Sequence, residues 1–284
     1  MKIAHLSDVH VLDLTGVRAT RFLNKRLTGL ANLIGRRRAA HPPHLLEAAV
    51  SSLLADPVDH VVITGDLSNL ALETEFRRAR DLISPLGDRR RLSVIPGNHD
   101  VYTRGSARAQ RFEAFFGDLM WAPGEPALYP WFKDLGSAKL LGFNSAYPTA
   151  PLLAVGRIPP EQYERLAARA TAGELASGAV IALVHHNLHA RSWRKDLMHG
   201  LADRDRFVSA CASAGIDVIL HGHTHKAHRF SRDGVTIIGC GSSTWSDPHP
   251  DHRARYNVYD VRDGALHGTE VRVWDPAEQR FAAR

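Results

Sequence analysis

The chain of 284 residues is 44% apolar and 23% charged, with a net charge of +6 and a pI near 9.6. That composition is ordinary for a globular protein, and the two cysteines, Cys211 and Cys240, have no CxxC partner, which excludes a disulfide framework. No stretch is apolar over a sufficient length to predict a signal peptide or a membrane span, so we expect a cytoplasmic protein.

Short apolar runs that end in polar residues predict the first set of strands. These five runs span residues 2–6, 59–64, 92–95, 179–184 and 217–221. Apolar residues at helical spacing predict helices at residues 43–55, 72–84, 106–116, 160–172 and 201–214. Three further strands are expected near the C-terminus, at residues 235–239, 256–261 and 265–274.

The alternation of strands and helices predicts a parallel sheet and therefore an α/β fold. The late strands indicate a second, mixed sheet that packs on the first. No internal repeat or low-complexity linker divides the sequence, so we expect one domain over residues 1–284, with a basic helical insertion at about 17–40. Ligands of such folds gather at the carboxyl ends of the strands.

Side chains that can bind metal ions follow all five strands of the first set. Asp8 and His10 are two positions apart, as are His223 and His225, so each pair would face one side of an extended chain. The full set has two carboxylates, one amide and four imidazoles: Asp8, His10, Asp66, Asn98, His185, His223 and His225. Seven ligands suit two ions that share a carboxylate, about 3.5–4 Å apart. Nitrogen and oxygen ligands without thiolate favour Mn²⁺ or Fe, with Zn²⁺ as a further candidate.

Each of these motifs has a structural explanation when it is taken alone. Gly65-Asp66 and Gly97-Asn98 are typical of turns, and His185-His186 after a strand fits one packed and one exposed histidine. Gly222-His223-Thr224-His225 leaves fewer structural alternatives. Because the five motifs occur in this order, each at the end of a predicted strand, the binuclear metal site is the better interpretation.

The motifs resemble the five signature blocks of the calcineurin-like metallophosphoesterase superfamily, in a pattern similar to its bacterial members of the cyclic-nucleotide-phosphodiesterase type. The blocks are Asp8-x-His10, Gly65-Asp66, Gly97-Asn98-His99-Asp100, His185-His186 and Gly222-His223-Thr224-His225. They span residues 8–225, which is most of the chain. The resemblance implies a four-layer αββα sandwich, in which two mixed β-sheets are flanked by helices.

The resemblance also implies a role for each site residue. One ion would be held by Asp8, His10, Asp66 and His225, and the other by Asp66, Asn98, His185 and His223, with Asp66 bridging. His99 would not bind metal but would contact the phosphoryl group and protonate the leaving oxygen. The ions would neutralise the phosphate charge, and a hydroxide that bridges them would attack in line.

The sequence departs from the superfamily pattern at two places. Protein phosphatases of the superfamily have an Asp three residues after the metal-binding Asp of the second block, whereas this chain has Asn69. A neutral amide cannot stabilise an imidazolium as a carboxylate does, which argues against a protein phosphatase. Many cyclic-nucleotide phosphodiesterases of the superfamily have two prolines after the paired histidines, whereas this chain has Asn187 and Leu188.

These observations predict a phosphodiesterase that acts on a small-molecule or lipid-linked phosphoester. One alternative is a nuclease, although no added DNA-binding region is visible, which argues against nucleic acid as a partner. A second alternative is a scaffold without catalytic activity, although the complete ligand set disfavours it.

Residues 18–38, RATRFLNKRLTGLANLIGRRR, hold seven basic residues and no acid. Leu23, Leu27, Leu30 and Ile34 would form one stripe of a helix. The stripe would either pack on the enzyme as a cap helix or contact an anionic membrane or lipid substrate near the site. We therefore leave peripheral membrane binding open as an expectation.

Overall fold

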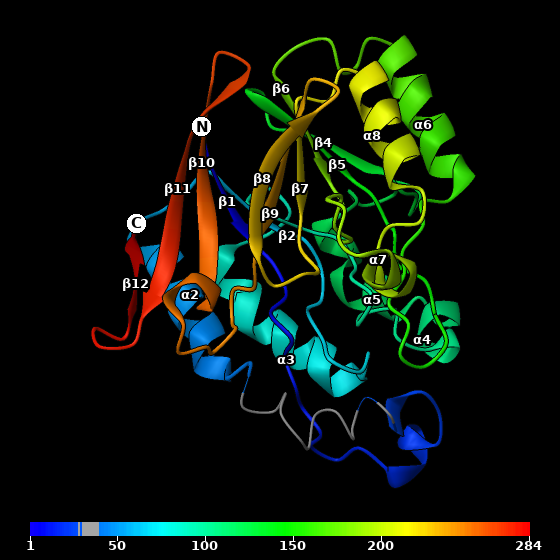
Figure 1. Cartoon of the computed structure of the whole chain (residues 1–284), viewed down its shortest axis with the longest axis vertical. Helices are drawn as coiled ribbons and strands as arrows, with labels where there is room; N and C mark the ends of the chain where they lie inside the picture. The colour runs from blue at the N-terminus through cyan, green and yellow to red at the C-terminus, as the bar shows by residue number, and fades with distance from the viewer. Residues whose placement is uncertain (28, 30–39) are drawn as a thin grey trace.

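The structure is a computed structural model that describes residues 1–27, 29 and 40–284 (Figure 1). The first sheet contains β12 (Arg280–Ala283), β11 (Ala265–Asp275), β10 (Arg255–Arg262), β1 (Lys2–Leu6), β2 (His60–Ile63) and β3 (Leu92–Val94), in this spatial order. The second contains β4 (Trp131–Asp134), β5 (Ala138–Gly142), β6 (Ala179–Leu183), β7 (Val218–His221), β9 (Val235–Cys240) and β8 (Ala227–Arg232).

Both sheets are mixed. β1, β2 and β3 are parallel to one another, whereas β10 pairs antiparallel with β1 and continues into antiparallel β11 and β12. In the second sheet, β5, β6, β7 and β9 are parallel, and β4 and β8 pair antiparallel at the two edges. The parallel strands of each sheet therefore deliver their following loops to one edge.

Helices cover the outer faces of the two sheets. They are α2 (Pro43–Ala55), α3 (Glu73–Ile83), α4 (Arg104–Arg108), α5 (Arg111–Phe116), α6 (Pro160–Thr171), α7 (Trp193–His199) and α8 (Arg204–Ser213). Short 3₁₀ turns occur at η1 (Ala19–Phe22), η3 (Ser84–Leu86), η4 (Gly117–Leu119) and η5 (Pro250–His252).

The side chains of β6 show how the layers stack. Ile181 belongs to the larger core, which also contains residues of the first sheet and of α2, α3 and α5. Its neighbour Val180 points the other way, into a smaller core with Leu166 of α6 and Phe207 of α8. Successive strand residues face opposite sides of a sheet, so the two cores lie on either face of β6. The predicted four-layer αββα sandwich is thereby confirmed.

Four strands and one helix, β4, β5, β8, β12 and α7, were not predicted from the sequence. β8 is an edge strand whose side chains are exposed or half-buried, so it lacks the apolar run that marks a buried strand. The helix predicted at 106–116 is divided into α4 and α5 at Gln110, which has a left-handed backbone with φ of 43°. No helix among the described residues combines the length and the apolar character needed to cross a membrane.

The basic segment differs from its prediction where the structure describes it. Leu23 and Leu27 of the predicted apolar stripe are 80% and 59% exposed, whereas Arg26, which is not part of that stripe, is buried. The Arg26 guanidinium donates to the carbonyl oxygens of Leu70 and Ala71, at 2.7 and 2.9 Å. Leu30, Ile34 and the three arginines at 36–38 lie outside the described residues.

Candidate metal centre

The seven predicted ligands converge where the carboxyl ends of the parallel strands of both sheets meet. Asp8 and His10 follow β1, Asp66 follows β2, and Asn98 follows β3. From the second sheet, His185 follows β6, while His223 and His225 follow β7. Five of the seven are buried, and His223 and His225 are partly exposed.

Five of these seven residues have a left-handed backbone. The φ angles are 52° at Asp8, 47° at His10, 55° at Asp66, 75° at His223 and 55° at His225. Non-glycine residues seldom adopt this conformation, and it persists where the surrounding structure enforces it, often at functional sites. The expectation that each pair converges through an extended chain is therefore wrong, because left-handed turns direct these side chains.

Hydrogen bonds and two glycines hold these turns together. Asp8 N–H donates to the Gly65 carbonyl at 3.1 Å, and the Asp8 carboxylate accepts from the backbone N–H of His223 at 3.0–3.1 Å. A Cβ on Gly97 would lie 2.2 Å from Asp66 Oδ1, and one on Gly222 would lie 2.6 Å from Asp8 Oδ2. The carboxylates can take their positions because these glycines have no side chain.

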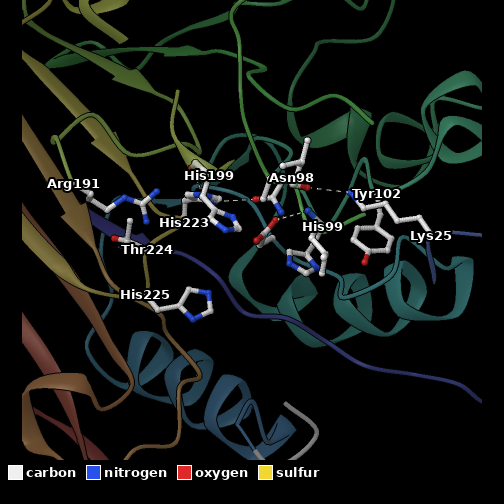
Figure 2. Close-up of a pocket in the computed structure, with 13 residues that line it drawn as sticks. Lys25, Asn98, His99, Tyr102, Arg191, His199, His223, Thr224 and His225 are labelled. Atoms are coloured by element: carbon white, nitrogen blue, oxygen red, sulfur yellow. Dashed lines mark hydrogen bonds between the residues drawn. The ribbon is translucent and has the colours of Figure 1, made fainter. Parts of the chain in front are cut away.

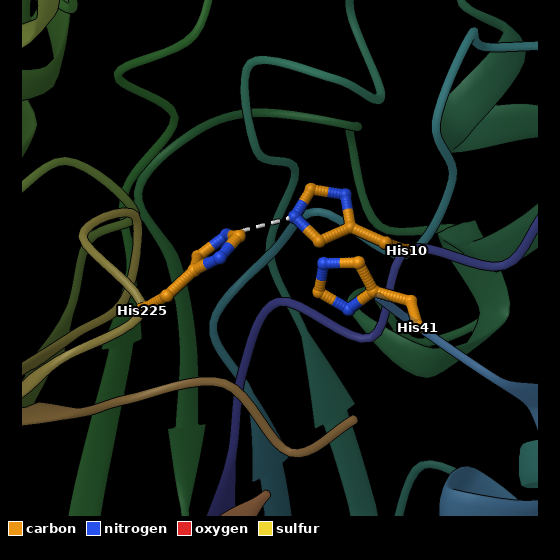
Figure 3. A group of neighbouring side chains, drawn as sticks. All are labelled: His10, His41 and His225. Atoms are coloured by element: carbon orange, nitrogen blue, oxygen red, sulfur yellow. Dashed lines mark hydrogen bonds between the residues drawn. The ribbon is translucent and has the colours of Figure 1, made fainter. Parts of the chain in front are cut away.

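The first group of candidate ligands surrounds His10. Its Nε2 lies 3.0 Å from His225 Nε2 (Figure 3). The same nitrogen lies 3.7 Å from Asp66 Oδ2 and 4.0 Å from Asp8 Oδ1. His225 Nε2 is in turn 3.4 Å from Asp8 Oδ1. Burial and the neighbouring imidazole of His41 keep the pKa of His10 well below its usual range, so a neutral His10 can offer a lone pair.

The second group surrounds Asn98. Its Oδ1 lies 2.9 Å from His223 Nδ1 and 3.1 Å from His185 Nε2. Asp66 Oδ2 is 3.4 Å from His185 Nε2, so this oxygen is close to both groups. The other oxygen, Oδ1, accepts from the backbone N–H of His99 at 2.8 Å, which fixes the orientation of the carboxylate.

Carbonyl oxygens set the tautomers of both imidazoles in the second group. His185 Nδ1 lies 2.8 Å from the Thr64 carbonyl, and His223 Nε2 lies 2.6 Å from the His199 carbonyl. A carbonyl only accepts hydrogen bonds, so these two nitrogens carry protons. The other ring nitrogens, His185 Nε2 and His223 Nδ1, face Asn98 Oδ1.

The ligand atoms around Asn98 favour a cation placed between them. Burial opposes a charge on His185, but Asp66 outweighs that effect and raises the pKa of His185 to about 9. The same attraction lowers the pKa of Asp66 well below its usual range, against the effect of burial. Carboxylate, amide and imidazole atoms that face one another are the donor set of a transition-metal site, and a bound cation would replace the proton that the raised pKa places on His185, so these residues fit the expected ions.

Asp100 joins the loops that carry Asp66 and Asn98. Its carboxylate accepts from the backbone N–H groups of Gly97, Leu67 and Ser68, at 2.8–3.1 Å, and from Ser68 Oγ at 2.9 Å. Burial and the nearby Asp66 raise the pKa of Asp100 to about 7.

His99 lies beside the two groups. Its Nδ1 is 2.7 Å from the Asn69 carbonyl oxygen, so this nitrogen donates, and Nε2 lies at the other side of the ring. The His99 ring meets the His10 ring edge-on at 4.9 Å and stacks on Tyr102 at 5.5 Å. This placement, close to the candidate ligands but oriented by a carbonyl, suits a group that donates a proton.

The family model for calcineurin-like phosphoesterases matches residues 1–227. The chain belongs to the calcineurin-like phosphoesterase family. It is therefore a metal-dependent phosphoester hydrolase, and the resemblance seen in the sequence is confirmed.

Two relatives of this calcineurin-like phosphoesterase are also described as phosphoesterases. A "probable cyclic nucleotide phosphodiesterase" of Vesicomyosocius okutanii is 25% identical over 218 residues, which cover 77% of this chain and 84% of the relative. A protein of the same description from Synechococcus is 23% identical over 225 residues, with 79% and 80% covered.

Solved structures show the same fold. A dimetal phosphatase from Danio rerio superposes with a TM-score of 0.61 at 14% identity, with 95% of each chain covered. A purple acid phosphatase from yellow lupin gives a TM-score of 0.62 at 13% identity, with all of this chain and 52% of that one covered.

A pocket of about 360 Å³ opens over the candidate ligands of this phosphoesterase (Figure 2). Lys25 and Tyr102 lie on one side of it and Arg191 on the other, with Asn98 and His223 between them. Burial lowers the pKa of Lys25 to about 8, and burial also lowers that of Arg191. Cationic walls around a metal centre suit an anionic substrate.

Sequence motifs missed His41, which lies near the centre. His41 is buried, with its ring 4.4 Å from His10 and 5.3 Å from His225, and its Nδ1 2.8 Å from Thr244 Oγ1 (Figure 3). It precedes α2 and not a strand end, so no strand-end pattern could find it. His186, whose role was left open, is buried with its Nδ1 2.7 Å from Ser145 Oγ.

Proposed function

We propose that this enzyme is a phosphodiesterase that uses two divalent transition-metal ions, Mn²⁺ or Fe in first place and Zn²⁺ as a further candidate. The proposed ligands are Asp8, His10, Asp66 and His225 for one ion, and Asp66, Asn98, His185 and His223 for the other. The observation that carries the proposal is that Asp66 Oδ2 lies 3.7 Å from His10 Nε2 and 3.4 Å from His185 Nε2, between the two groups.

When bound, such ions supply positive charge to the phosphoryl oxygens and acidify a water molecule. The chain's own contribution is orientation and proton transfer. His99 is proposed to donate a proton from Nε2 to the leaving oxygen, while its Nδ1–H stays bonded to the Asn69 carbonyl. Lys25 and Arg191 add positive charge at the pocket walls, where the rest of the substrate would lie.

Two features support a small phosphodiester as the substrate. The pocket of about 360 Å³ is in the range of sites for small molecules. The curated relatives are named for cyclic-nucleotide phosphodiesterase activity, so cyclic nucleotides are the first compounds to test. A lipid-linked substrate remains a prediction that rests on residues 18–38, of which 28 and 30–38 lie outside the described residues.

The proposal is tested with bis(p-nitrophenyl) phosphate and p-nitrophenyl phosphate, which share a leaving group. We expect Mn²⁺-loaded enzyme to hydrolyse the diester faster than the monoester, with loss of activity after chelation and recovery when Mn²⁺ is returned. Faster hydrolysis of the monoester would contradict the phosphodiesterase assignment. Activity that survives complete chelation would contradict the metal requirement.

A further inference from the structure

A second pocket, of about 730 Å³, adjoins the active-site pocket. The two pockets share Lys25 and Tyr102 as a common wall. Tyr102 stacks on the proposed proton donor His99 at 5.5 Å, and Lys25 Nζ lies 4.5 Å from the centre of the Tyr102 ring. A substrate arm that extends from a phosphoryl group bound near His99 would therefore reach the second pocket by passing the ring of Tyr102.

The second pocket is lined by five basic side chains and by no acidic one among the described residues: Arg21, Lys25, Arg26, Arg104 and Arg111. Two of these, Arg21 and Arg111, share a single carboxylate, Glu73, at 3.2 and 3.3 Å. The guanidinium of Arg26 donates to the carbonyl oxygens of Leu70 and Ala71, and it forms no ion pair with a carboxylate of the described residues.

Arg104 is the most available charge in this pocket. It is exposed, lies two residues after Tyr102 at the start of α4, and makes no hydrogen bond or ion pair with any residue that the structure describes. Lys25 is held against the wall instead, because its Nζ donates to Thr149 Oγ1 at 2.8 Å and to the Leu153 carbonyl at 3.3 Å.

The positive charges in this pocket are incompletely balanced by the protein. Burial and the neighbouring Arg111 lower the pKa of Arg26 to about 10, against the opposing effect of Glu75. Burial alone lowers the pKa of Lys25 to about 8. A bound anion would offset both effects, and guanidinium groups match the geometry of phosphate oxygens.

We propose that this pocket binds a second phosphate or phosphonate group of the substrate, which Arg104 contacts directly while the phosphodiester is cleaved at the metal centre. This inference rests on the proposed phosphodiesterase function. The preferred substrate would then be a phosphodiester in which one alcohol carries a further phosphate. Because Lys25 and Tyr102 belong to both pockets, we assign the anion to the substrate and not to free phosphate.

The test uses pairs of p-nitrophenyl alkyl phosphodiesters with butyl, hexyl or octyl chains. One member of each pair ends in a methyl group and the other in a phosphonate, so the leaving group is constant. For at least one chain length, we expect the phosphonate ending to raise kcat/KM of wild type about tenfold, through a lower KM.

The ratio of kcat/KM for the phosphonate-ended substrate to kcat/KM for the methyl-ended one should fall to near one in Arg104→Ala and below one in Arg104→Glu. Arg108→Ala is the matched control, because Arg108 is exposed on the same helix and does not line the pocket. It should keep the wild-type ratio, whereas an equal loss there would indicate only a general effect of surface charge and would overturn the assignment to Arg104.

Equal kcat/KM values for all pairs in wild type would overturn the inference. If free butylphosphonate changed the rate on methyl-ended diesters in an Arg104-dependent way while the pairs stayed equal, the site would bind a free anion instead. Failure to hydrolyse even the methyl-ended diesters would contradict the proposed function itself, so the two failures are distinguishable.

Discussion

The imidazole of His99 is held at Nδ1 by the backbone of Asn69 and not by the Asn69 side chain, since His99 Nδ1 lies 2.7 Å from the Asn69 carbonyl oxygen. The Asn69 side chain points elsewhere, and its Nδ2 donates to the His10 carbonyl at 2.5 Å. Although Asn69 replaces the Asp of protein phosphatases, His99 still has a hydrogen-bond acceptor, the Asn69 carbonyl oxygen. A neutral acceptor stabilises an imidazolium less than a carboxylate does, which suits a readier proton donor.

We expect Asn69→Ala to show the same dependence of kcat on leaving-group pKa as wild type, because the carbonyl that holds His99 is still present. The lost bond to the His10 carbonyl should weaken metal affinity instead, since it supports the turn at His10. Titration with Mn²⁺ and rates on a series of aryl diesters separate the two effects. A steeper dependence of kcat on leaving-group pKa than in wild type, at saturating Mn²⁺, would show that the side chain itself serves proton transfer.

For His99→Ala, we expect full metal content and a loss of turnover of about 10²–10⁴-fold on substrates with alkyl leaving groups. The loss should be smaller with p-nitrophenol, because that leaving group needs little protonation. His267→Ala, which removes an exposed histidine, is the matched control. If His99→Ala lost metal, His99 would be a ligand and its proposed role would be wrong.

Asp100→Ala should destabilise the protein on the order of 3 kcal/mol, because the backbone N–H groups of Gly97, Leu67 and Ser68 would lose their buried acceptor. Those N–H groups position the loops of Asp66 and Asn98, so metal affinity should fall as well. Chemical unfolding and Mn²⁺ titration measure the two effects. A variant of wild-type stability would show that the loops are held by other contacts.

Glu75 should make stability depend on pH. Its carboxylate is buried beneath the loop that Arg26 contacts, and burial raises its pKa from 4.5 to about 8. The folded state then keeps a proton that the unfolded chain has released, so this contribution is complete below about pH 4.5 and is lost as pH rises through about 8. The Tm measured by thermal unfolding should decline less over this pH range for Glu75→Gln than for wild type. An identical decline would contradict the raised pKa.

The sequence was sufficient to predict an α/β fold and the convergence of the candidate ligands, and the family resemblance supplied the four layers. The expected division of the strands between the sheets was wrong, because the late strands β10 and β11 join β1, β2 and β3, whereas β6 and β7 lie in the other sheet. The buried parallel strands are continuous apolar runs, and the polar residues at their ends meet because parallel strands deliver their loops to one edge. The sequence could not show the left-handed turns at Asp8 and His10, because they depend on contacts with loops after β2 and β7. His41 was missed for a related reason, since only tertiary packing brings it to His10.

The basic segment shows a different limit. Periodicity predicted that Leu23 and Leu27 would share a stripe that is either packed on the enzyme or membrane-facing; both are exposed, which contradicts the packed alternative, and Arg26 is buried against backbone carbonyls. A pattern of apolar spacing cannot foresee an arginine that satisfies carbonyl oxygens in the interior. The segment contributes Lys25 to the active-site pocket, which spacing alone could not show.

The stoichiometry of bound metal tests the central claim most directly. Elemental analysis of wild-type enzyme, saturated with Mn²⁺ and freed of loosely bound ions, should find close to two ions per chain. Asp66→Asn should lower that number and abolish activity, because its Oδ2 lies near both groups of ligands. A single ion per chain at saturating Mn²⁺, with Asp66 intact, would contradict the bridged metal pair.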